Sequence, residues 1–268
     1  MNRLTVIIPC KDEQQNIRAC IESVRDLADE ILVADSGSTD RTLQIVREMG
    51  GCRIIQREYI NSANFKNWAI PQAAHPWVLL VDADERATEQ LCGEIHEVLA
   101  ATPQFDGYSM RFQPFFMGRP LMHSCSKTTT AIRLFRRECR YDSSHVHANI
   151  DLPAGRVKRL EGKFDHHTSK SLTHFFAKQN RYATWKAEDM YLAGRRTGYL
   201  GVLLRPPTRF LQFFLLRAGF LDGVPGLVMC LIVAYYTFMK YAKLWEMTHV
   251  DTAERPKAAS PEDVRSAA

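Results

Sequence analysis

The chain has 268 residues, 46% hydrophobic and 24% charged, an ordinary globular balance with material for one large domain or one domain with an appendage. The formal net charge of +5 fits polyphosphate ligands, nucleic acid or an anionic membrane and does not choose among them. Seven cysteines, odd in number and without a CxxC pair, exclude a disulfide framework and indicate reduced thiols in a cytosolic compartment.

Strand and helix patterns alternate over the first hundred residues. Residues 4–9 (LTVIIP) form a continuous apolar run, as expected of a strand buried on both faces, and the charges that follow argue against a signal peptide. Further strands are predicted at 30–34, 52–58 and 77–81, and helices at 13–27, 39–49, 63–74 and 88–101. Asp12 is the predicted N-cap of the first helix. This alternation predicts an α/β fold with a parallel, doubly wound sheet.

Three polar clusters follow strands of this predicted sheet, at residues 9–13, 35–40 and 82–85. Parallel strands place their carboxyl ends at one edge, and ligands of doubly wound sheets bind beyond that edge. The clusters are therefore expected to converge on one site.

The middle of the chain loses the regular alternation. Strands are predicted at 107–116 and 130–137, a loop-like region rich in His and Asp at 139–169, and a long helix at 171–194. We find no internal repeat.

The region from residue 200 onward combines basic and aromatic residues. Arg205, Arg209 and Arg217 punctuate runs of Leu and Phe, and residues 224–239 carry no charge. That run is short for a membrane span and is interrupted near its start by Pro225. The pattern favours a segment lying in an anionic membrane surface; a buried helical pair covering the sheet, or one re-entrant or spanning helix, are the alternatives. The tail is predicted to be disordered.

The sequence Asp82-Ala-Asp84 directly after a buried strand is the sharpest chemical signal. Mg²⁺ and Mn²⁺ prefer oxygen ligands and often combine one or two carboxylates with substrate phosphates. Such a metal would neutralise a diphosphate leaving group. The alternative is a solvated acidic turn, but the position after WVLLV favours the metal site.

Two further positions are candidates for nucleotide binding. Asp35 follows the second strand, where a carboxylate can accept hydrogen bonds from a base or a ribose. Lys66, in NFKNWA, could pair with a diphosphate, although by composition alone a surface lysine covering apolar neighbours is the simpler interpretation.

The histidines at 145, 147, 166 and 167 raise the question of zinc. Closed zinc sites usually show tighter spacing and cysteine partners, so we instead expect one or two of these histidines to line the acceptor side of the cleft.

These segments together resemble glycosyltransferase family 2, in particular its lipopolysaccharide-core β-glucosyltransferase branch. The resemblance covers about residues 3 to 246 and rests on an ordered set of motifs: TVIIPCKDEQQNI, EILVADSGSTDRT, NFKNWAI, WVLLVDADE, AIRLFRR, VHANI and FLDG with YAKLWE. It implies a GT-A (Rossmann-like) fold, a nucleotide-diphosphate sugar as donor, Mg²⁺ or Mn²⁺, and inversion at the anomeric carbon.

The resemblance also implies roles for individual residues. Pro9 and Glu13 would border the nucleotide, and Asp35 would meet the base. Lys66 matches a lysine of the family's QKN-like segment. Asp82 and Asp84 match the metal motif, with Asp84 as the direct ligand, and Arg133 lies in the RLF strand near the cleft.

One departure concerns the catalytic base. Many relatives have Val-His-Glu where this chain has Val-His147-Ala148. An inverting transferase needs a base that takes the proton of the acceptor hydroxyl, and alanine cannot serve. Asp142 is the predicted substitute, with Asp151 and His147 in reserve.

The sequence therefore predicts a bacterial enzyme on the cytoplasmic face of the inner membrane, moving a hexose from a nucleotide sugar to a lipid-linked or lipopolysaccharide-core acceptor. The expected organisation is a transferase domain at 1–170, a membrane-associating helical region at 171–248 and a disordered tail at 249–268.

Other functions also have to be considered for this sequence. The change at Ala148 also fits a degenerate protein that binds nucleotide sugar or glycan without turnover. A phosphatase-like or receiver-like pocket would need a phosphoacceptor Asp and a later strand-end Lys, which we do not find. Nucleic acid is not an expected partner, because the basic residues alternate with large aliphatic ones.

Overall fold

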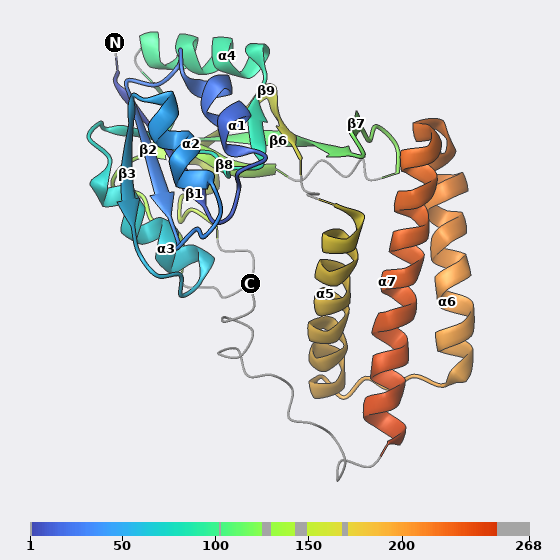
Figure 1. The fold of residues 1–268 in the computed structure, drawn as a ribbon. Helices are drawn as coiled ribbons and strands as arrows, with labels where there is room; N and C mark the ends of the chain where they lie inside the picture. The colour runs from blue at the N-terminus through green and yellow to red at the C-terminus, as the bar shows by residue number, and fades with distance from the viewer. Residues whose placement is uncertain (1, 102, 125–129, 143–148, 168–170, 251–268) are drawn as a thin grey trace. The chain divides into compact units, whose positions relative to one another are not determined.

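The computed structural model describes residues 2–101, 103–124, 130–142, 149–167 and 171–250 (Figure 1). The chain divides into two compact units, Met1–Lys170 and Ser171–Ala268, here called unit 1 and unit 2. The described residues of each unit are considered separately below.

Unit 1 is built on one mixed sheet with the strand order β3-β2-β1-β4-β8-β6-β9-β5, and β7 pairs with β6. The strands are β1 (Leu4–Cys10), β2 (Glu30–Asp35), β3 (Cys52–Gln56), β4 (Trp77–Leu80), β5 (Glu85–Ala87), β6 (Gly107–Phe116), β7 (Arg119–Pro120), β8 (Thr130–Arg136) and β9 (Val157–His166). The first four of the strand order are parallel, as predicted, and antiparallel pairing begins where β8 joins β4. The α/β fold class is confirmed, with a sheet that is parallel on one side and mixed on the other.

Helices connect these strands. They are α1 (Ile17–Val24), α2 (Thr42–Met49), α3 (Ser62–Ala69) with the 3-10 turn η1 (Ile70–Gln72), α4 (Glu89–Ala100) and the 3-10 turn η2 (Ala154–Arg156). Thr88 caps α4, since its side chain accepts a hydrogen bond from the backbone N–H of Leu91 at 3.3 Å.

Strand β1 shows why the sheet is buried on both faces. Val6 and Ile8 pack into the cluster that contains Ile17 of α1, whereas Ile7 packs into the opposite cluster with Phe65 of α3. Alternate side chains of a strand point to opposite faces, so a continuous apolar run is what two covered faces require. The core therefore fixes the strands whose ends carry the polar clusters.

Two local predictions are wrong. The first helix begins at Ile17 with Asn16 at its N-cap, because Asp12 has a positive φ of 51° and its carboxylate accepts the backbone N–H of Thr39 instead. The region 139–169 is not all loop, since β9 runs from residue 157 to 166 between β6 and β5. Its inward residues, Leu160 and Phe164 among them, alternate with polar ones, which hides the strand in a charged sequence.

Unit 2 is helical. Helices α5 (Leu172–Leu192) and α6 (Tyr199–Leu211) both pack against α7 (Gly223–His249), and the π-helical turn η3 (Gln212–Leu216) and the 3-10 turn η4 (Gly219–Asp222) join α6 to α7. Among the described residues, the segment Gly219–His249 is long and apolar enough to cross a membrane: an 18-residue window within it has a mean hydropathy of 1.6, and 33% of that window is buried. The tail predicted at 249–268 lies outside the described residues from residue 251 onward.

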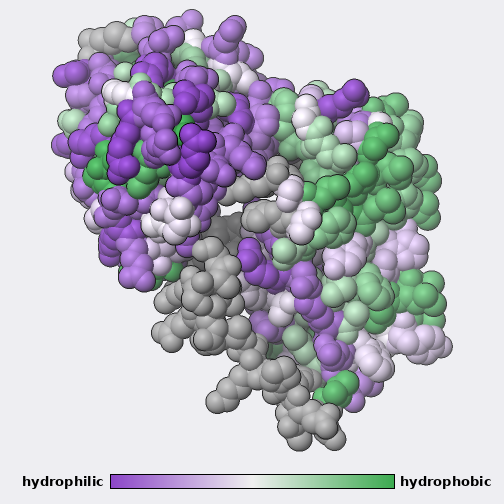
Figure 2. Space-filling model, in the orientation of Figure 1, coloured by the Kyte–Doolittle hydropathy of each residue, from purple (hydrophilic) through white to green (hydrophobic). Residues whose placement is uncertain are grey.

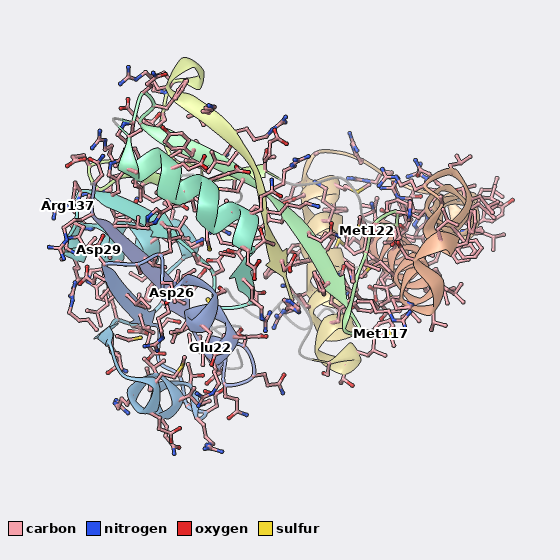
Figure 3. The ribbon with its side chains drawn as sticks, turned by 90° about the horizontal axis from the view of Figure 1, so that it is seen from above. Glu22, Asp26, Asp29, Met117, Met122 and Arg137 are labelled. Atoms are coloured by element: carbon pink, nitrogen blue, oxygen red, sulfur yellow. The ribbon has the colours of Figure 1, made fainter. Side chains whose placement is uncertain are left out.

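The surfaces of the two units differ in apolar content. The large hydrophobic side chains that unit 1 exposes, within its described part, are Tyr59, Ile60 and the pair Met117 and Met122 beside the β6–β7 turn (Figure 3). Unit 2 exposes many more, and Figure 2 shows hydrophobic residues gathered over its helices. An apolar groove of about 660 Å³ between α6 and α7 belongs to this surface.

Candidate active site

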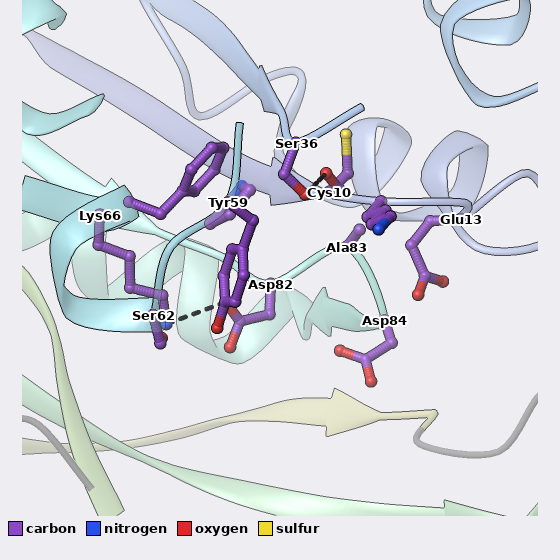
Figure 4. A pocket seen from close by; sticks show the side chains of 12 residues that line it. Cys10, Glu13, Ser36, Tyr59, Ser62, Lys66, Asp82, Ala83 and Asp84 are labelled. Carbon is purple, nitrogen blue, oxygen red and sulfur yellow. Dashed lines mark hydrogen bonds and ion pairs between the residues drawn. The ribbon is translucent and has the colours of Figure 1, made fainter. Parts of the chain in front are cut away.

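A cavity of about 320 Å³ lies at the carboxyl ends of β1 and β4, as the strand order predicts. Its lining includes five of the predicted site residues: Pro9, Glu13, Lys66, Asp82 and Asp84. It also includes Tyr59, from the segment joining β3 to α3, and Ser62, the first residue of α3. No sequence signal indicated either residue. Figure 4 shows Lys66, Ser62, Tyr59 and Asp82 on one side of the view and Glu13 and Asp84 on the other.

Hydrogen bonds join the loop after β1 to the loop after β2. The backbone N–H of Asp12 donates to Ser38 Oγ at 2.9 Å, and that of Glu13 donates to Thr42 Oγ1 at 2.7 Å. In return, Thr39 N–H donates to Asp12 Oδ1 at 2.7 Å. These bonds hold two of the three predicted clusters together at one edge of the cavity.

Asp35 is fully buried behind the cavity wall. Its carboxylate accepts the backbone N–H groups of Gly37 and Ser38, both at 3.1 Å, and the side-chain amide of Gln56 at 3.0 Å. Asp35 thus shapes the turn that places Ser36 in the cavity lining, and Gly37 takes a φ of 92° that suits glycine. Its predicted contact with the base stays a prediction.

Asp82 is held between two cations. Lys66 Nζ is 3.2 Å from Oδ1, and an Arg133 guanidinium nitrogen is 2.8 Å from Oδ2. Burial alone would raise the pKa of Asp82, but Arg133 and Lys66 outweigh it and hold that pKa well below its usual range. The carboxylate is therefore ionised, and both of its oxygens face a positive charge.

Glu85 contacts both Arg133 and the backbone of Asp82. Its Oε1 is 2.5 Å from the Arg133 guanidinium, and its Oε2 accepts the backbone N–H of Asp82 at 2.9 Å. The side chain is almost wholly buried, and this burial raises the pKa of Glu85 to about 7 against the opposing effect of Arg133. Glu85 orients Arg133 and the end of β4, a role that its place in the acidic run did not reveal.

Asp84 meets the end of β9. Its Oδ2 is 3.4 Å from His166 Nε2, and the backbone N–H of His167 donates to the Asp84 carbonyl at 2.8 Å. Burial lowers the pKa of His166, but hydrogen bonding to Asp84 more than compensates, so the pKa lies above its usual value. Pairing of β9 with β5 brings this histidine to the site, a long-range consequence that sequence spacing could not supply.

The donor chemistry at this edge fits a divalent cation that takes most of its ligands from substrate and water. Within the described ranges no group of three or more His, Cys, Asp and Glu side chains could hold a metal. Asp82 is already neutralised by Lys66 and Arg133. In the described part of the chain, His166 is the ion-pair partner of Asp84. A carboxylate with few partners and open phosphate positions is the usual arrangement for Mg²⁺.

Tyr141, the residue before the predicted base Asp142, contacts two residues of α3. Tyr141 exchanges two hydrogen bonds with the side chain of Asn67, at 2.8 and 2.9 Å, and its ring lies 5.5 Å from Lys66 Nζ. Asp142, the next residue, is exposed. His145, His147 and Ala148 lie outside the described residues.

Comparison with known proteins identifies the family of this chain. The model of the family described as "Glycosyl transferase family 2" matches residues 5–161. The lipopolysaccharide core biosynthesis glycosyltransferase LpsC of Rhizobium meliloti is 30% identical over 250 residues, which are 91% of this chain and 92% of LpsC. The glycosyltransferase RT0209 of Rickettsia typhi is 26% identical over 92% of this chain and 88% of its own length.

Two solved structures are also similar. S. aureus TarS 1–349 in complex with UDP is 17% identical, covers 90% of this chain and 91% of its own, and has a TM-score of 0.46. Glucosyl-3-phosphoglycerate synthase from Mycobacterium tuberculosis, in complex with Mn²⁺ and UDP-glucose, is 20% identical over 44% of each chain, with a TM-score of 0.34. The family model covers more than half of the chain and agrees with a relative of nearly full length, so the chain belongs to glycosyl transferase family 2.

Proposed function

We propose that this glycosyltransferase moves a hexose from a nucleoside-diphosphate sugar to a lipid-linked or lipopolysaccharide-core acceptor, with inversion and with Mg²⁺ or Mn²⁺ bound. The observation that carries the proposal is the cavity at the ends of β1 and β4, where Asp82, Asp84 and Lys66 lie together. The similarity to LpsC supports the class of acceptor.

The leaving diphosphate is the main electrostatic demand of the reaction. A bound divalent cation would neutralise charge on it, and Asp84, with His166 beside it, is the proposed holder. Lys66 lines the same cavity and is kept in place by Asp82 and by the Tyr141 ring, so it offers a fixed positive charge to the diphosphate. Asp82 acts through Lys66 and Arg133 in this scheme.

The nucleotide is proposed to bind against the cavity lining formed by the segments after β1, β2 and β3. Pro9 lines the cavity from the end of β1, Glu13 and Ser36 line it from the loops after β1 and β2, and Tyr59 lines it from the segment before α3. The Tyr59 ring is 45% exposed and is supported by the Phe65 ring, with centroids 5.9 Å apart. An exposed, supported ring can stack on a base.

The proposed base for the acceptor hydroxyl is Asp142. It follows Tyr141, whose ring lies 5.5 Å from Lys66 Nζ and whose backbone N–H donates to the Asn67 side chain, so it is close in sequence to residues at the cavity. His147 and Asp151 are the other two candidates. The absence of a glutamate at position 148 also supports a second function, binding of nucleotide sugar without turnover.

Membrane attachment is proposed for unit 2. Its exposed residues include Leu203, Leu216 and Phe238, and the apolar groove between α6 and α7 adds to the surface they form. Contiguous apolar surface of this kind marks an interaction site. We place it at the cytoplasmic face of the inner membrane, lying peripherally or with α7 inserted.

The test is sugar transfer by the purified full-length protein with a panel of nucleotide sugars, in Mn²⁺ and in EDTA. Asp84→Asn is expected to lower the rate by about 100-fold or more, because it removes a charge that acts on the leaving group. Asp26→Asn, on the surface just after α1, is the matched control and is expected to keep full activity (Figure 3). Full activity of Asp84→Asn, or full activity in EDTA, would contradict the metal scheme.

The same experiment separates the second function. Donor binding by calorimetry without any product, after long incubation with lipopolysaccharide-core acceptors, would establish a binding protein and refute transfer.

A further inference from the structure

Two basic side chains from different helices share one aromatic ring in unit 2. The guanidinium carbon of Arg205, on α6, is 4.1 Å from the centroid of the Tyr241 ring, and Nζ of Lys240, on α7, is 4.8 Å from the same centroid. Lys240 also lies 5.4 Å from the Tyr236 ring. Aromatic faces attract cations, so these rings hold two like charges close together where α6 meets α7.

The Phe213 ring likewise lies close to two basic side chains. The guanidinium carbons of Arg209 and Arg217 lie 4.9 and 4.2 Å from the centroid of the Phe213 ring. Arg209 follows Arg205 by four residues on α6, so both project from the same face of the helix. We call Arg205, Arg209, Arg217 and Lys240 the basic stripe.

In the part of the chain that the structure describes, no carboxylate pairs with the basic stripe. Within the described residues none of its four side chains forms an ion pair, and the sequence from 199 to 249 contains only Asp222 and Glu246 as acidic residues. Like charges held together without a counter-charge repel one another, and an anion bound between them would remove that repulsion. The stripe is therefore complementary to a phosphate-bearing ligand.

The surroundings of the stripe identify the source of the phosphate. Leu203 and Leu204 precede Arg205 and are 65% and 53% exposed, and Leu215 and Leu216 precede Arg217 and are 54% and 84% exposed. A soluble anion would gain nothing from these side chains. A phospholipid presents phosphate next to acyl chains, and so matches cations that alternate with exposed leucines.

We propose that the basic stripe binds the phosphate groups of anionic phospholipids, while the leucines beside it enter the acyl layer. This deepens the membrane contact of the proposed function by naming the lipid class and the residues that recognise it. It does not depend on the transfer chemistry of unit 1.

The experiment is flotation of the full chain with vesicles of phosphatidylcholine, alone or mixed with phosphatidylglycerol. Each basic residue at an anionic surface contributes about fivefold in binding, so R205Q/R209Q is expected to bind the mixed vesicles roughly 30-fold more weakly. The control R195Q/R196Q removes the same two charges from the turn between α5 and α6 and is expected to lose less than about threefold. R205K/R209K keeps the charge and should bind nearly as the parent does.

Three outcomes would overturn the inference. Equal binding of the parent protein to both kinds of vesicle would exclude recognition of anionic lipid. Equal losses in R205Q/R209Q and R195Q/R196Q would show that only net charge matters. Release by potassium phosphate, but not by potassium chloride at matched ionic strength, would assign the stripe to free phosphate; equal release supports the lipid.

Further measurements keep the result unambiguous. Circular dichroism melting of each variant detects misfolding. Donor hydrolysis measured without vesicles is expected to be unchanged in R205Q/R209Q, so that failure of lipid binding and failure of the proposed transfer can be told apart.

Discussion

Arg133 lies between two carboxylates at the end of β4, and its position explains how the segment that follows this strand is held in place. It contacts Asp82 on the cavity side and Glu85 on the buried side, and its own side chain is 8% exposed. The ring of Phe112 lies 5.1 Å from its guanidinium carbon. One cation therefore fixes the orientation of Asp82 and compensates a carboxylate that water does not reach.

Replacing this cation tests its structural role. Arg133→Met leaves Glu85 buried without a positive partner, and the free energy of unfolding in urea is expected to fall by about 3 kcal/mol. The pKa of Glu85 is already raised above the unfolded value of 4.5, and loss of Arg133 raises it further. A carboxyl group whose pKa is raised in the folded state destabilises the protein progressively as the pH rises toward that pKa. The difference in the free energy of unfolding between the parent and Arg133→Met should therefore be larger at pH 8 than at pH 5.

The control for this prediction is Arg156→Met. Arg156 pairs with Asp106 on the surface, and the structure gives no reason for more than a slight change in stability. If the loss of stability in Arg133→Met became smaller with rising pH, ionisation of buried Glu85 would not be its cause.

At the scale of elements, β9 is held against α4 by a glycine. A Cβ atom at Gly162 would lie 2.5 Å from Leu91 Cα and 2.7 Å from Leu91 N, and backbone atoms cannot move aside as a flexible side chain can. The carboxylate of Glu94 also accepts the Gly162 N–H at 3.0 Å, which fixes the approach of helix to strand. Because β9 carries His166 at its end, this contact also positions the partner of Asp84.

Gly162→Ala is expected to lower the free energy of unfolding by about 1–3 kcal/mol, since helix and strand must separate to admit one methyl group. Gly93→Ala is the matched control: it lies on α4, has open space around its Cβ position, and is expected to raise stability by about 1 kcal/mol through helix propensity. Chemical denaturation measures both. A neutral Gly162→Ala would mean that β9 is not packed against α4 as described.

The elements also show where sequence reasoning succeeded. Local signals located the parallel strands and the long helix of unit 2, because two-sided burial and amphipathic spacing leave their mark in a few neighbouring residues. Thr88 was a readable start for α4 for the same reason. Strand β9 was missed, since it owes its place to pairing with β6 and β5, residues far away in the chain.

Some features of the candidate site could also be predicted from local sequence, and others could not. Asp82 and Asp84 could be predicted, because a strand end and a short acidic motif are local. The cation pair around Asp82 and the histidine beside Asp84 come from α3, β8 and β9, so only the folded sheet assembles them. Asp35 was located correctly at the end of β2, but its burial and its three hydrogen-bond donors were not readable from spacing.

At the scale of the whole molecule, each unit contains hydrophobic clusters made of its own residues. The large hydrophobic clusters of unit 1 consist of residues between Leu4 and Phe164, whereas a cluster containing Ala187 and Leu244 belongs to unit 2. The cavity of the candidate site is lined wholly by unit 1, and the basic stripe lies wholly in unit 2. Chemistry and lipid contact are therefore expected to separate along the chain.

A truncated protein of residues 1–170 tests this separation. Because the hydrophobic clusters of unit 1 are made of residues 4–164, the fragment is expected to unfold cooperatively and to be stabilised by UDP-sugars with Mn²⁺ in a thermal-shift assay. It should no longer float with vesicles containing phosphatidylglycerol, whereas the full chain should. The same fragment carrying Asp84→Asn is the control for specific donor binding. A fragment that is unfolded, or one that floats as the full chain does, would show that the two units share stability or that unit 1 has its own membrane contact.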